Sequence, residues 1–87
     1  MTPVICEATI LDATHTLLVH FSDGANIQYD ASKLLLNPAF ERLRNWGYFK
    51  NFHIAPGGYA LIWDNDTDIS ENEIYTNGKR LDPTSTG

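Results

Sequence analysis

The dipeptide Asp23-Gly24 is the feature that most constrains how this chain can fold, because it separates two alternating segments. On both sides of it, residues suited to burial occupy every second position: Leu17, Val19, Phe21, Ile27 and Tyr29. A period of two places such side chains on one face of a strand. Asp-Gly favours a tight hairpin because glycine accepts a positive φ without a Cβ clash. The sequence therefore predicts two antiparallel strands that share one buried face.

Three more segments extend the predicted sheet. Residues 4–10 are rich in β-branched side chains and favour a strand before this hairpin. Residues 52–55 and 59–63 flank Pro56-Gly57-Gly58, which is typical of a turn and predicts a second hairpin. We therefore expect about five antiparallel strands in two hairpin groups.

Helix starts are visible at two further places. Asn37-Pro38 supplies an N-cap residue followed by proline at the first helical position, and Gly47 can end that helix. Ser70 and Glu73 match a capping box and predict a last helix that ends near Gly78. Asp30 or Ser32 can also cap a short turn through residues 34–36. With two to three short helices the chain is expected to be an α+β domain, and its core to contain Leu17, Val19, Phe21, Ile27, Phe40, Leu43, Ile54 and Leu61.

Length and composition indicate one small domain. A chain of 87 residues is too short for two hydrophobic cores, so residues 1–78 are expected to form a single unit and the polar residues 79–87 a flexible tail. No apolar run approaches the roughly 20 residues that cross a bilayer, and the N-terminus lacks a secretory signal. Cys6 is the only cysteine, which excludes an internal disulfide. We expect a cytoplasmic protein without a membrane segment.

Charge is unevenly distributed along the chain. The net charge is −5, yet residues 31–51 contain four Lys or Arg against one Glu, whereas residues 52–78 contain five Asp or Glu and no Lys or Arg. This pattern favours a protein partner, or self-association between the basic helix and the acidic 64–73 loop, over direct nucleic-acid binding. Aromatic residues beside arginine are typical of interfaces. The candidate interaction residues are Arg42, Arg44, Trp46, Tyr48, Asp64, Asp66 and Asp68.

No catalytic or metal-binding motif stands out. The acids at 64, 66 and 68 resemble the start of a calcium loop, but Ile69 stands where glycine is needed and Tyr75 where a bidentate Glu is needed. An EF-hand is excluded, and the run is interpreted as a loop and helix cap, with a weak surface cation site as the alternative. Cys6 lies in an apolar strand, where a thiol is expected to be inert packing. We expect no enzyme activity, no metal and no cofactor.

Several motifs in order carry a family resemblance. They are Phe21-Ser22-Asp23-Gly24, Tyr29-Asp30-Ala31-Ser32, Phe40 with Leu43, Phe49, Trp63, Asp68-Ile69 and Ile74-Tyr75. From about Val4 to Gly78 the chain resembles the bacterial domain-of-unknown-function family 2442. The resemblance implies an α+β domain with a curved antiparallel sheet. Some relatives carry a helix-turn-helix after this domain, and members are often encoded beside another small protein, as in a toxin–antitoxin pair.

Two hypotheses follow for the function. The first is a non-catalytic interaction module, the regulatory and antitoxin-like member of a small two-protein system. The second is a ligand-binding sensory domain of a transcription regulator that lacks its DNA-binding half. Because no helix-turn-helix follows in this sequence, direct DNA binding is not expected. The family has no established catalytic or binding residues to carry over to this chain.

Overall fold

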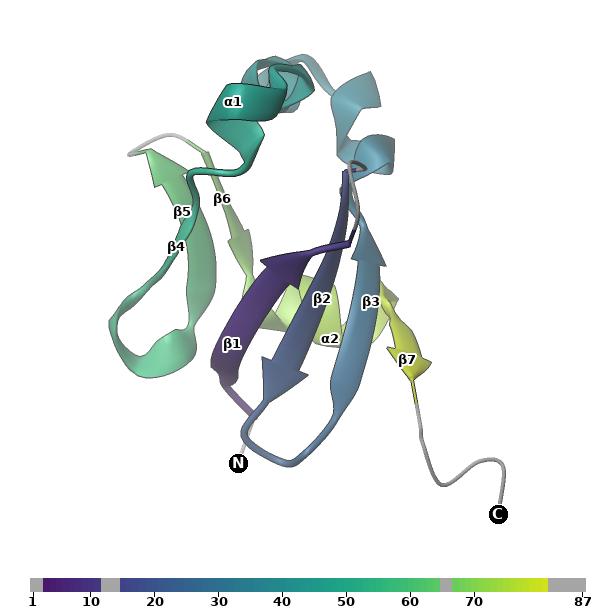
Figure 1. Cartoon of the computed structure of the whole chain (residues 1–87), viewed down its shortest axis with the longest axis vertical. Coiled ribbons are helices and arrows are strands. Elements are labelled where there is room, and N and C mark those ends of the chain that lie inside the picture. The colour runs from purple at the N-terminus through teal and green to yellow at the C-terminus, as the bar shows by residue number, and fades with distance from the viewer. Residues whose placement is uncertain (1–2, 12–14, 65–66, 82–87) are drawn as a thin grey trace.

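A computed structural model describes residues 3–11, 15–64 and 67–81 (Figure 1). Within these ranges seven strands form two antiparallel sheets. The first sheet has the order β1-β2-β3-β7 and comprises β1 (Ile5–Ile10), β2 (Thr16–Phe21), β3 (Asn26–Asp30) and β7 (Lys79–Leu81). The second has the order β4-β5-β6 and comprises β4 (His53–Ile54), β5 (Ala60–Asp64) and β6 (Thr67–Ser70). The α+β class is confirmed, with more short strands than the five expected.

The hairpin predicted at Asp23-Gly24 joins β2 to β3. Gly24 has a φ of 90°, and Val19 lies opposite Ile27 across the ladder. The alternating residues of β2, Leu17, Val19 and Phe21, are all completely buried. A period of two in the sequence has thus become one buried face and one outer face, as predicted.

The two sheets meet where β1 lies against β4 and the following turn η3 (Pro56–Gly58). Gly58 has a φ of 76°, and a Cβ placed on it would lie 2.5 Å from the carbonyl oxygen of Ile5. Such a distance is shorter than any van der Waals contact, so the backbones approach this closely only because residue 58 has no side chain. The second sheet therefore continues beside the first, and both face a common core (Figure 1).

Three short helices cross one end of the sheets and form what we call the helical cap (residues 31–49). They are η1 (Ala31–Leu36), η2 (Pro38–Arg44) and α1 (Trp46–Phe49) (Figure 1, top). Asn37 caps η2 as predicted, since its side chain accepts a hydrogen bond from the Ala39 amide. The expectation of one helix ending at Gly47 is wrong. Asn45, in an extended conformation, ends η2 and caps α1 by accepting from the Tyr48 amide, so two shorter helices replace one.

Helix α2 (Glu71–Asn77) connects β6 to β7 and has half of the predicted capping box. The Ser70 hydroxyl accepts from the Glu73 amide at 3.1 Å, but the Glu73 side chain bonds elsewhere. The helix ends at Gly78, as predicted. The first three residues of the segment predicted as a tail form β7, in which Lys79 lies opposite Gln28 of β3. Residues 82–87 lie outside the described residues.

The core lies between the two sheets, α2 and the cap. Six of the eight predicted core residues are buried: Leu17, Val19, Phe21, Ile27, Leu43 and Leu61. Phe40 and Ile54 are only half-buried, because they pack against the edge of the core. Cys6 is exposed, which corrects the expectation of a packed thiol. It occupies the irregular point of the β1–β2 register, between Ile5 and Glu7.

Buried aromatic rings pack between the cap and the second sheet. The indole of Trp63 on β5 stacks on Phe49 of α1 with centroids 5.7 Å apart, and its Nε1 donates to the Phe49 carbonyl at 2.7 Å. A buried indole needs a partner for its N–H, and here the partner is the last residue of the cap. This contact fixes where the cap ends relative to the sheets.

Candidate functional site

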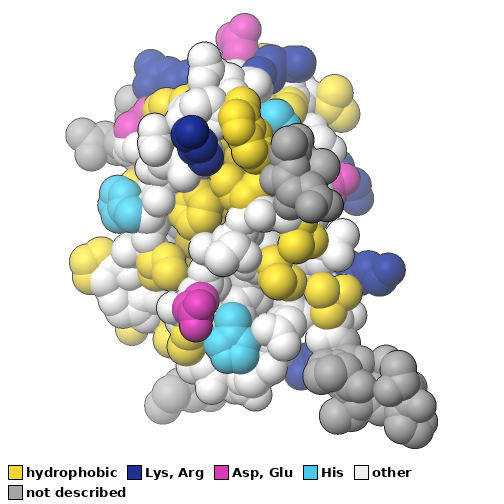
Figure 2. Space-filling model, viewed as in Figure 1, with side chains coloured by type: hydrophobic (Ala, Val, Ile, Leu, Met, Phe, Trp, Pro, Cys, Tyr) yellow, Lys and Arg dark blue, Asp and Glu magenta, His cyan; other side chains and the backbone are white. Residues whose placement is uncertain are grey.

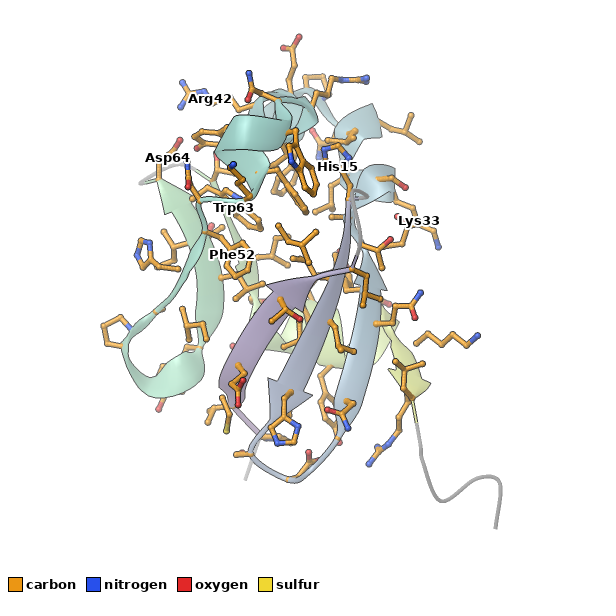
Figure 3. All side chains as sticks on the ribbon, viewed as in Figure 1. His15, Lys33, Arg42, Phe52, Trp63 and Asp64 are labelled. Carbon is orange, nitrogen blue, oxygen red and sulfur yellow. The ribbon has the colours of Figure 1, made fainter. Side chains whose placement is uncertain are left out.

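Three of the predicted interaction residues form one cluster. The Arg42 guanidinium donates to Asp64 Oδ2 at 2.9 Å, and the Tyr48 hydroxyl donates to the same oxygen (Figure 3). The hydrogen bond to Asp64 stabilises the charged guanidinium and raises the pKa of Arg42. Burial, followed by the Asp64 carboxylate, raises the pKa of Tyr48, which keeps its hydroxyl a donor. The basic cap and the acidic loop therefore meet within one chain.

The remaining predicted residues lie apart from this cluster. Arg44 donates to the Leu35 carbonyl at 2.8 Å and thereby ties η2 to η1. Trp46 is 37% exposed, and its ring lies edge-on to His15 at 5.9 Å. Asp68 is exposed on β6, and Asp66 lies outside the described residues. The six predicted residues that the structure describes are thus spread over the cap, β5 and β6 rather than gathered in one site.

Large apolar side chains are exposed on the cap. Leu36 at the end of η1 is 85% exposed. Trp46 at the start of α1 is also exposed, at 37%. Tyr59, at 61% exposed, lies away from them in the β4–β5 hairpin. Figure 2 shows Lys and Arg side chains around the cap end of the molecule. The cap therefore combines exposed apolar groups with three of the chain's six Lys and Arg residues.

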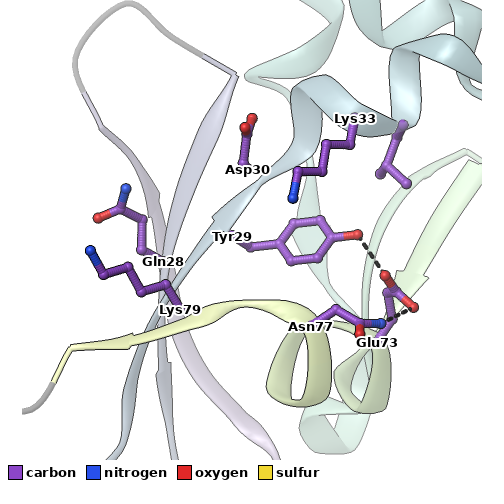
Figure 4. A pocket seen from close by; sticks show the side chains of 8 residues that line it. Gln28, Tyr29, Asp30, Lys33, Glu73, Asn77 and Lys79 are labelled. Carbon is purple, nitrogen blue, oxygen red and sulfur yellow. Dashed lines mark hydrogen bonds between the residues drawn. The ribbon is translucent and has the colours of Figure 1, made fainter.

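Sequence reasoning did not find the cavity between η1 and α2, which we call the η1–α2 groove (Figure 4). It has a volume of about 480 Å³ and is lined by Gln28, Tyr29, Asp30, Lys33, Leu34, Glu73, Asn77 and Lys79. The Tyr29 hydroxyl donates to one oxygen of Glu73 and the Asn77 amide donates to the other, both at 2.9 Å. Tyr29 and Glu73 are 44 positions apart in the sequence, so only the fold brings them together.

Each acid in the groove already has hydrogen-bond donors. Burial, and then the bond to Glu73, raises the pKa of Tyr29, so the phenol stays neutral and donates. The Asp30 carboxylate accepts from the Ser32 hydroxyl and amide, which lowers its pKa. By contrast, neither Lys33 nor Lys79 forms an ion pair with a described residue, and both are exposed. The groups of the groove without a described side-chain partner therefore include two ammonium donors and the Gln28 amide.

A second pocket adjoins the groove. It has a volume of about 390 Å³, and its lining residues are Leu34, Phe40, Asp68, Ile69, Ser70 and Glu73. Leu34 and Glu73 line both cavities, so the two are neighbours. The second pocket is the more apolar in its side chains, because Leu34, Phe40 and Ile69 lie on its walls.

Groups that could carry metal or nucleophilic chemistry are dispersed. His15 Nε2 lies 2.8 Å from the Leu43 carbonyl, His20 Nδ1 lies 2.8 Å from the Asn26 side chain, and His53 is exposed on β4. Among the described residues no three His, Cys, Asp or Glu side chains are placed to hold a metal ion. In the same part of the chain, no helix is long and apolar enough to cross a membrane.

Comparison with known proteins assigns the family. Residues 5–80 match the family described as protein of unknown function DUF2442, and the chain belongs to that family. The match spans both sheets, the cap and α2, so the family corresponds to the whole fold described above. No curated protein and no solved structure matches the chain.

Proposed function

We propose that this domain is a non-catalytic interaction module that binds a protein partner through its helical cap. The observation that carries the proposal is the exposure of Leu36 and Trp46 on a cap that also carries Arg42 and Arg44. Exposed apolar and aromatic groups supply affinity when a partner covers them, and the neighbouring charges direct the encounter. A cytoplasmic, regulatory and antitoxin-like role in a two-protein system is part of the proposal, and it rests on the gene arrangement that the family resemblance implies.

Self-association is the simplest form of such an interaction. The basic cap of one copy would then meet the acidic 64–73 loop of another. Within the chain, however, Arg42 already forms an ion pair with Asp64. These two charges are therefore less available for pairing with a second copy. A foreign partner that faces the cap does not have to compete for Asp64, and we therefore favour a foreign partner.

A ligand-sensing domain is the second candidate. The η1–α2 groove favours it, since about 480 Å³ is within the range of small-molecule sites. The two functions differ in what they predict for Leu36 and Trp46, which do not line the groove and which a small ligand there leaves exposed.

The test is affinity capture from the native host with the tagged domain as bait. Leu36→Asp with Trp46→Ala is expected to abolish capture of the partner, and capture should weaken as salt is raised. Tyr59→Ala removes a ring outside the cap that is more exposed than that of Trp46, and it should capture the partner like the parent protein. If the double variant retains every protein that the parent retains, the cap is not the interface and the proposal fails.

A further inference from the structure

We propose that an extended segment of the partner protein adds to the second sheet, along the edge of β6 that faces away from β5. The segment runs antiparallel to β6 and places a Lys or Arg opposite Asp68, with an apolar residue directly before it. This inference rests on the proposed function as an interaction module. It adds a second contact beside the exposed cap and states what the partner must present there.

Strand β6 forms one edge of the second sheet. Among the described residues it pairs only with β5, in the order β4-β5-β6 (Figure 1). Edge strands present a row of N–H and C=O groups that a further strand can bind. A charged side chain on an edge limits which strand can add, and Asp68 is such a side chain. Two β6 edges paired about a two-fold axis at Asp68 would place like charges opposite each other, which favours a foreign strand over a second copy.

The ladder to β5 shows which main-chain groups of β6 are turned away from β5. The amide of Glu71 donates to the carbonyl of Tyr59 at 2.9 Å, and the register continues with Ile69 opposite Leu61. In an antiparallel ladder, hydrogen-bonded pairs alternate with non-bonded pairs, so Ile69 directs its N–H and C=O to β5. The N–H and C=O of Asp68 therefore point to the outer edge, where an added strand can bind them.

The side chains beside this edge favour a cation. Asp68 is exposed on β6, and its carboxylate has no hydrogen-bond or ion-pair partner among the described residues. Both charged residues that line the second pocket, Asp68 and Glu73, are acids. Lys33 and Lys79 line the neighbouring groove instead. A Lys or Arg directly opposite Asp68 therefore forms a favourable cross-strand pair, whereas an Asp or Glu there would be repelled.

The next position of the added strand faces the second pocket. Residues on either side of the one opposite Asp68 lie on the other face of the strand, which is the face that Ile69 shares. Ile69 is buried, and Leu34 and Phe40, which also line the pocket, are half-buried. An apolar side chain opposite Ile69 covers surface that Leu34 and Phe40 now expose, and this burial supplies affinity. In an antiparallel pair that position directly precedes the basic residue, so the spacing follows from the ladder.

A peptide titration followed by amide chemical shifts tests the inference. The probe is acetyl-Ser-Thr-Val-Lys-Thr-Thr-Ser-amide, and the first control peptide has Glu in place of Lys. The Lys peptide is expected to shift the amides of Asp68 and Ser70 in a saturable manner and to bind about five- to tenfold tighter than the Glu peptide. Equal binding of both peptides, shifts confined to the cap, or no saturation at millimolar peptide would each overturn the proposal.

Hydrogen exchange at saturating peptide identifies the main-chain groups that are bound. The Asp68 and Ser70 amides both point to the outer edge, so their exchange should slow when the peptide binds. The Ile69 amide is already bonded to β5 and should show no comparable slowing. Unchanged exchange at Asp68 and Ser70 would overturn strand addition.

Two N-methylated peptides decide whether the peptide's main chain makes the contact. In the added strand the Lys amide faces β6, and the amide of the preceding Val faces away from it. N-methylation of the Lys removes the hydrogen bond to the Asp68 carbonyl and should weaken binding about tenfold. N-methylation of the Val adds the same methyl group and should weaken binding much less. Equal weakening by the two methyl groups would overturn strand addition.

A charge exchange locates the basic residue of the partner. Asp68→Lys should reverse the preference, so that the Glu peptide binds more tightly than the Lys peptide. Glu7→Lys makes a similar change at an exposed strand residue outside the second pocket and should keep the preference of the parent protein. A preference for the Lys peptide that survives in Asp68→Lys would overturn the assignment of Asp68.

The same variants separate this inference from the proposed function. A partner that the parent protein and Asp68→Lys capture equally well would overturn the β6 contact and leave the interaction module standing. Cap variants that lose no captured protein would overturn the proposed function, and the peptide titration would still decide whether β6 accepts a strand. If the domain alone sediments as a dimer that Asp68→Lys disrupts, the edge binds a second copy, which would overturn the choice of a foreign strand.

Discussion

The first three strands and the helical cap are held in place by different kinds of interaction. In β2 every second side chain is completely buried, and the ladders to β1 and β3 run the length of the strand. In the cap, Ala31, Leu43 and Phe49 are the buried residues among nineteen positions. The sheet is therefore stabilised by burial, whereas the cap depends more on local hydrogen bonds.

The cap's polar contacts join its pieces and tie them to the sheets. Asn37 and Asn45 cap two of the helices, and Arg44 connects η2 to η1. Arg42 and Tyr48 reach across to Asp64 on β5. Individual hydrogen bonds contribute roughly 0.5–1.5 kcal/mol each, far less than a buried ring. The comparison predicts that substitutions in the sheet are costly and substitutions in the cap are mild.

The largest difference in free energy of unfolding is expected between Phe→Ala substitutions at two positions. Phe21→Ala empties a completely buried site in β2 and should lower the free energy of unfolding by about 3–5 kcal/mol. Phe40→Ala removes a half-buried ring in η2 and should lower it by only about 1–2 kcal/mol, since less surface returns to water. Urea unfolding measures both values. Equal losses would contradict the division into a buried sheet and a lightly packed cap.

The contact between the sheets gives the next largest effect. Gly58→Ala and Gly24→Ala both place a Cβ on a residue with positive φ, which costs about 1–2 kcal/mol in each case. Only at residue 58 does the Cβ also meet the Ile5 backbone, and this overlap should add about 1–3 kcal/mol. Thermal unfolding of the two variants compares them directly. If Gly58→Ala is no worse than Gly24→Ala, the approach of β1 to η3 is not tight.

Cap substitutions should have smaller and local effects. Asn37→Ala and Asn45→Ala each remove an N-cap acceptor and should cost about 1 kcal/mol. Amide hydrogen exchange is expected to quicken in residues 38–49 and to stay unchanged in β2 and β3. Asn72→Ala, an exposed position inside α2, is the control. Faster exchange throughout the sheet would show that the cap and the sheet unfold as one unit.

A pH-dependent effect is expected at Tyr29, where the sheet borders the groove. Its pKa is raised in the fold, so the neutral phenol stabilises the native state below the unfolded pKa of about 10, and this stabilisation is lost as pH rises above that value. Tyr29→Phe should therefore be less stable than the parent by about 0.5–1.5 kcal/mol at pH 7. The difference in free energy of unfolding between the parent and Tyr29→Phe should shrink as the pH rises above about 10. Tyr59→Phe serves as the exposed control, and a gap that widens with pH would reverse the sign argued here.

The smallest effect is expected in a nucleic-acid binding assay. The cap is basic, but the chain as a whole carries a net charge of −5, which opposes phosphate binding. Fluorescence polarisation with labelled DNA and RNA at physiological salt should show no sub-micromolar binding. Tight binding that Arg42→Glu with Arg44→Glu abolishes would mean that the cap recognises phosphate rather than protein.

The sequence predicted those parts of the fold that depend on local chemistry. The β2–β3 hairpin, the cap at Asn37 and the start of α2 at Ser70 each follow from residues within a few positions of one another. Strand β6 was missed although its burial alternates, with Thr67 and Ile69 inside and Asp68 outside. Of the acids that suggested metal ligands, Asp64 ends β5 and Asp68 faces outward on β6, so these two belong to different strands, and Asp66 lies outside the described residues.

Features that depend on long-range contacts were not predictable from the sequence. Phe40 has helical spacing to Leu43, but η2 is irregular at Phe40 itself, whose φ/ψ of −111°/17° are not helical, and its ring is only half-buried. The groove joins Tyr29 to Glu73, and each was noticed only for a local role, in a strand and in a capping box. The acidic and basic segments were expected to meet between copies, yet Arg42 and Asp64 meet within one chain.

The two extended asparagines of the cap divide it into three short rods with a joint between each pair. Asn37 and Asn45 have φ/ψ of −97°/122° and −75°/115°, so each joint bends through ordinary backbone torsions. Turning one rod relative to the next would break a capping bond of about 1 kcal/mol, and it would also break the hydrogen bond from Arg44 to Leu35 or separate Phe49 from Trp63. The three rods are therefore held at set angles. Leu36 and Trp46 are exposed on two different rods, so the base of the fold fixes the orientation of one relative to the other.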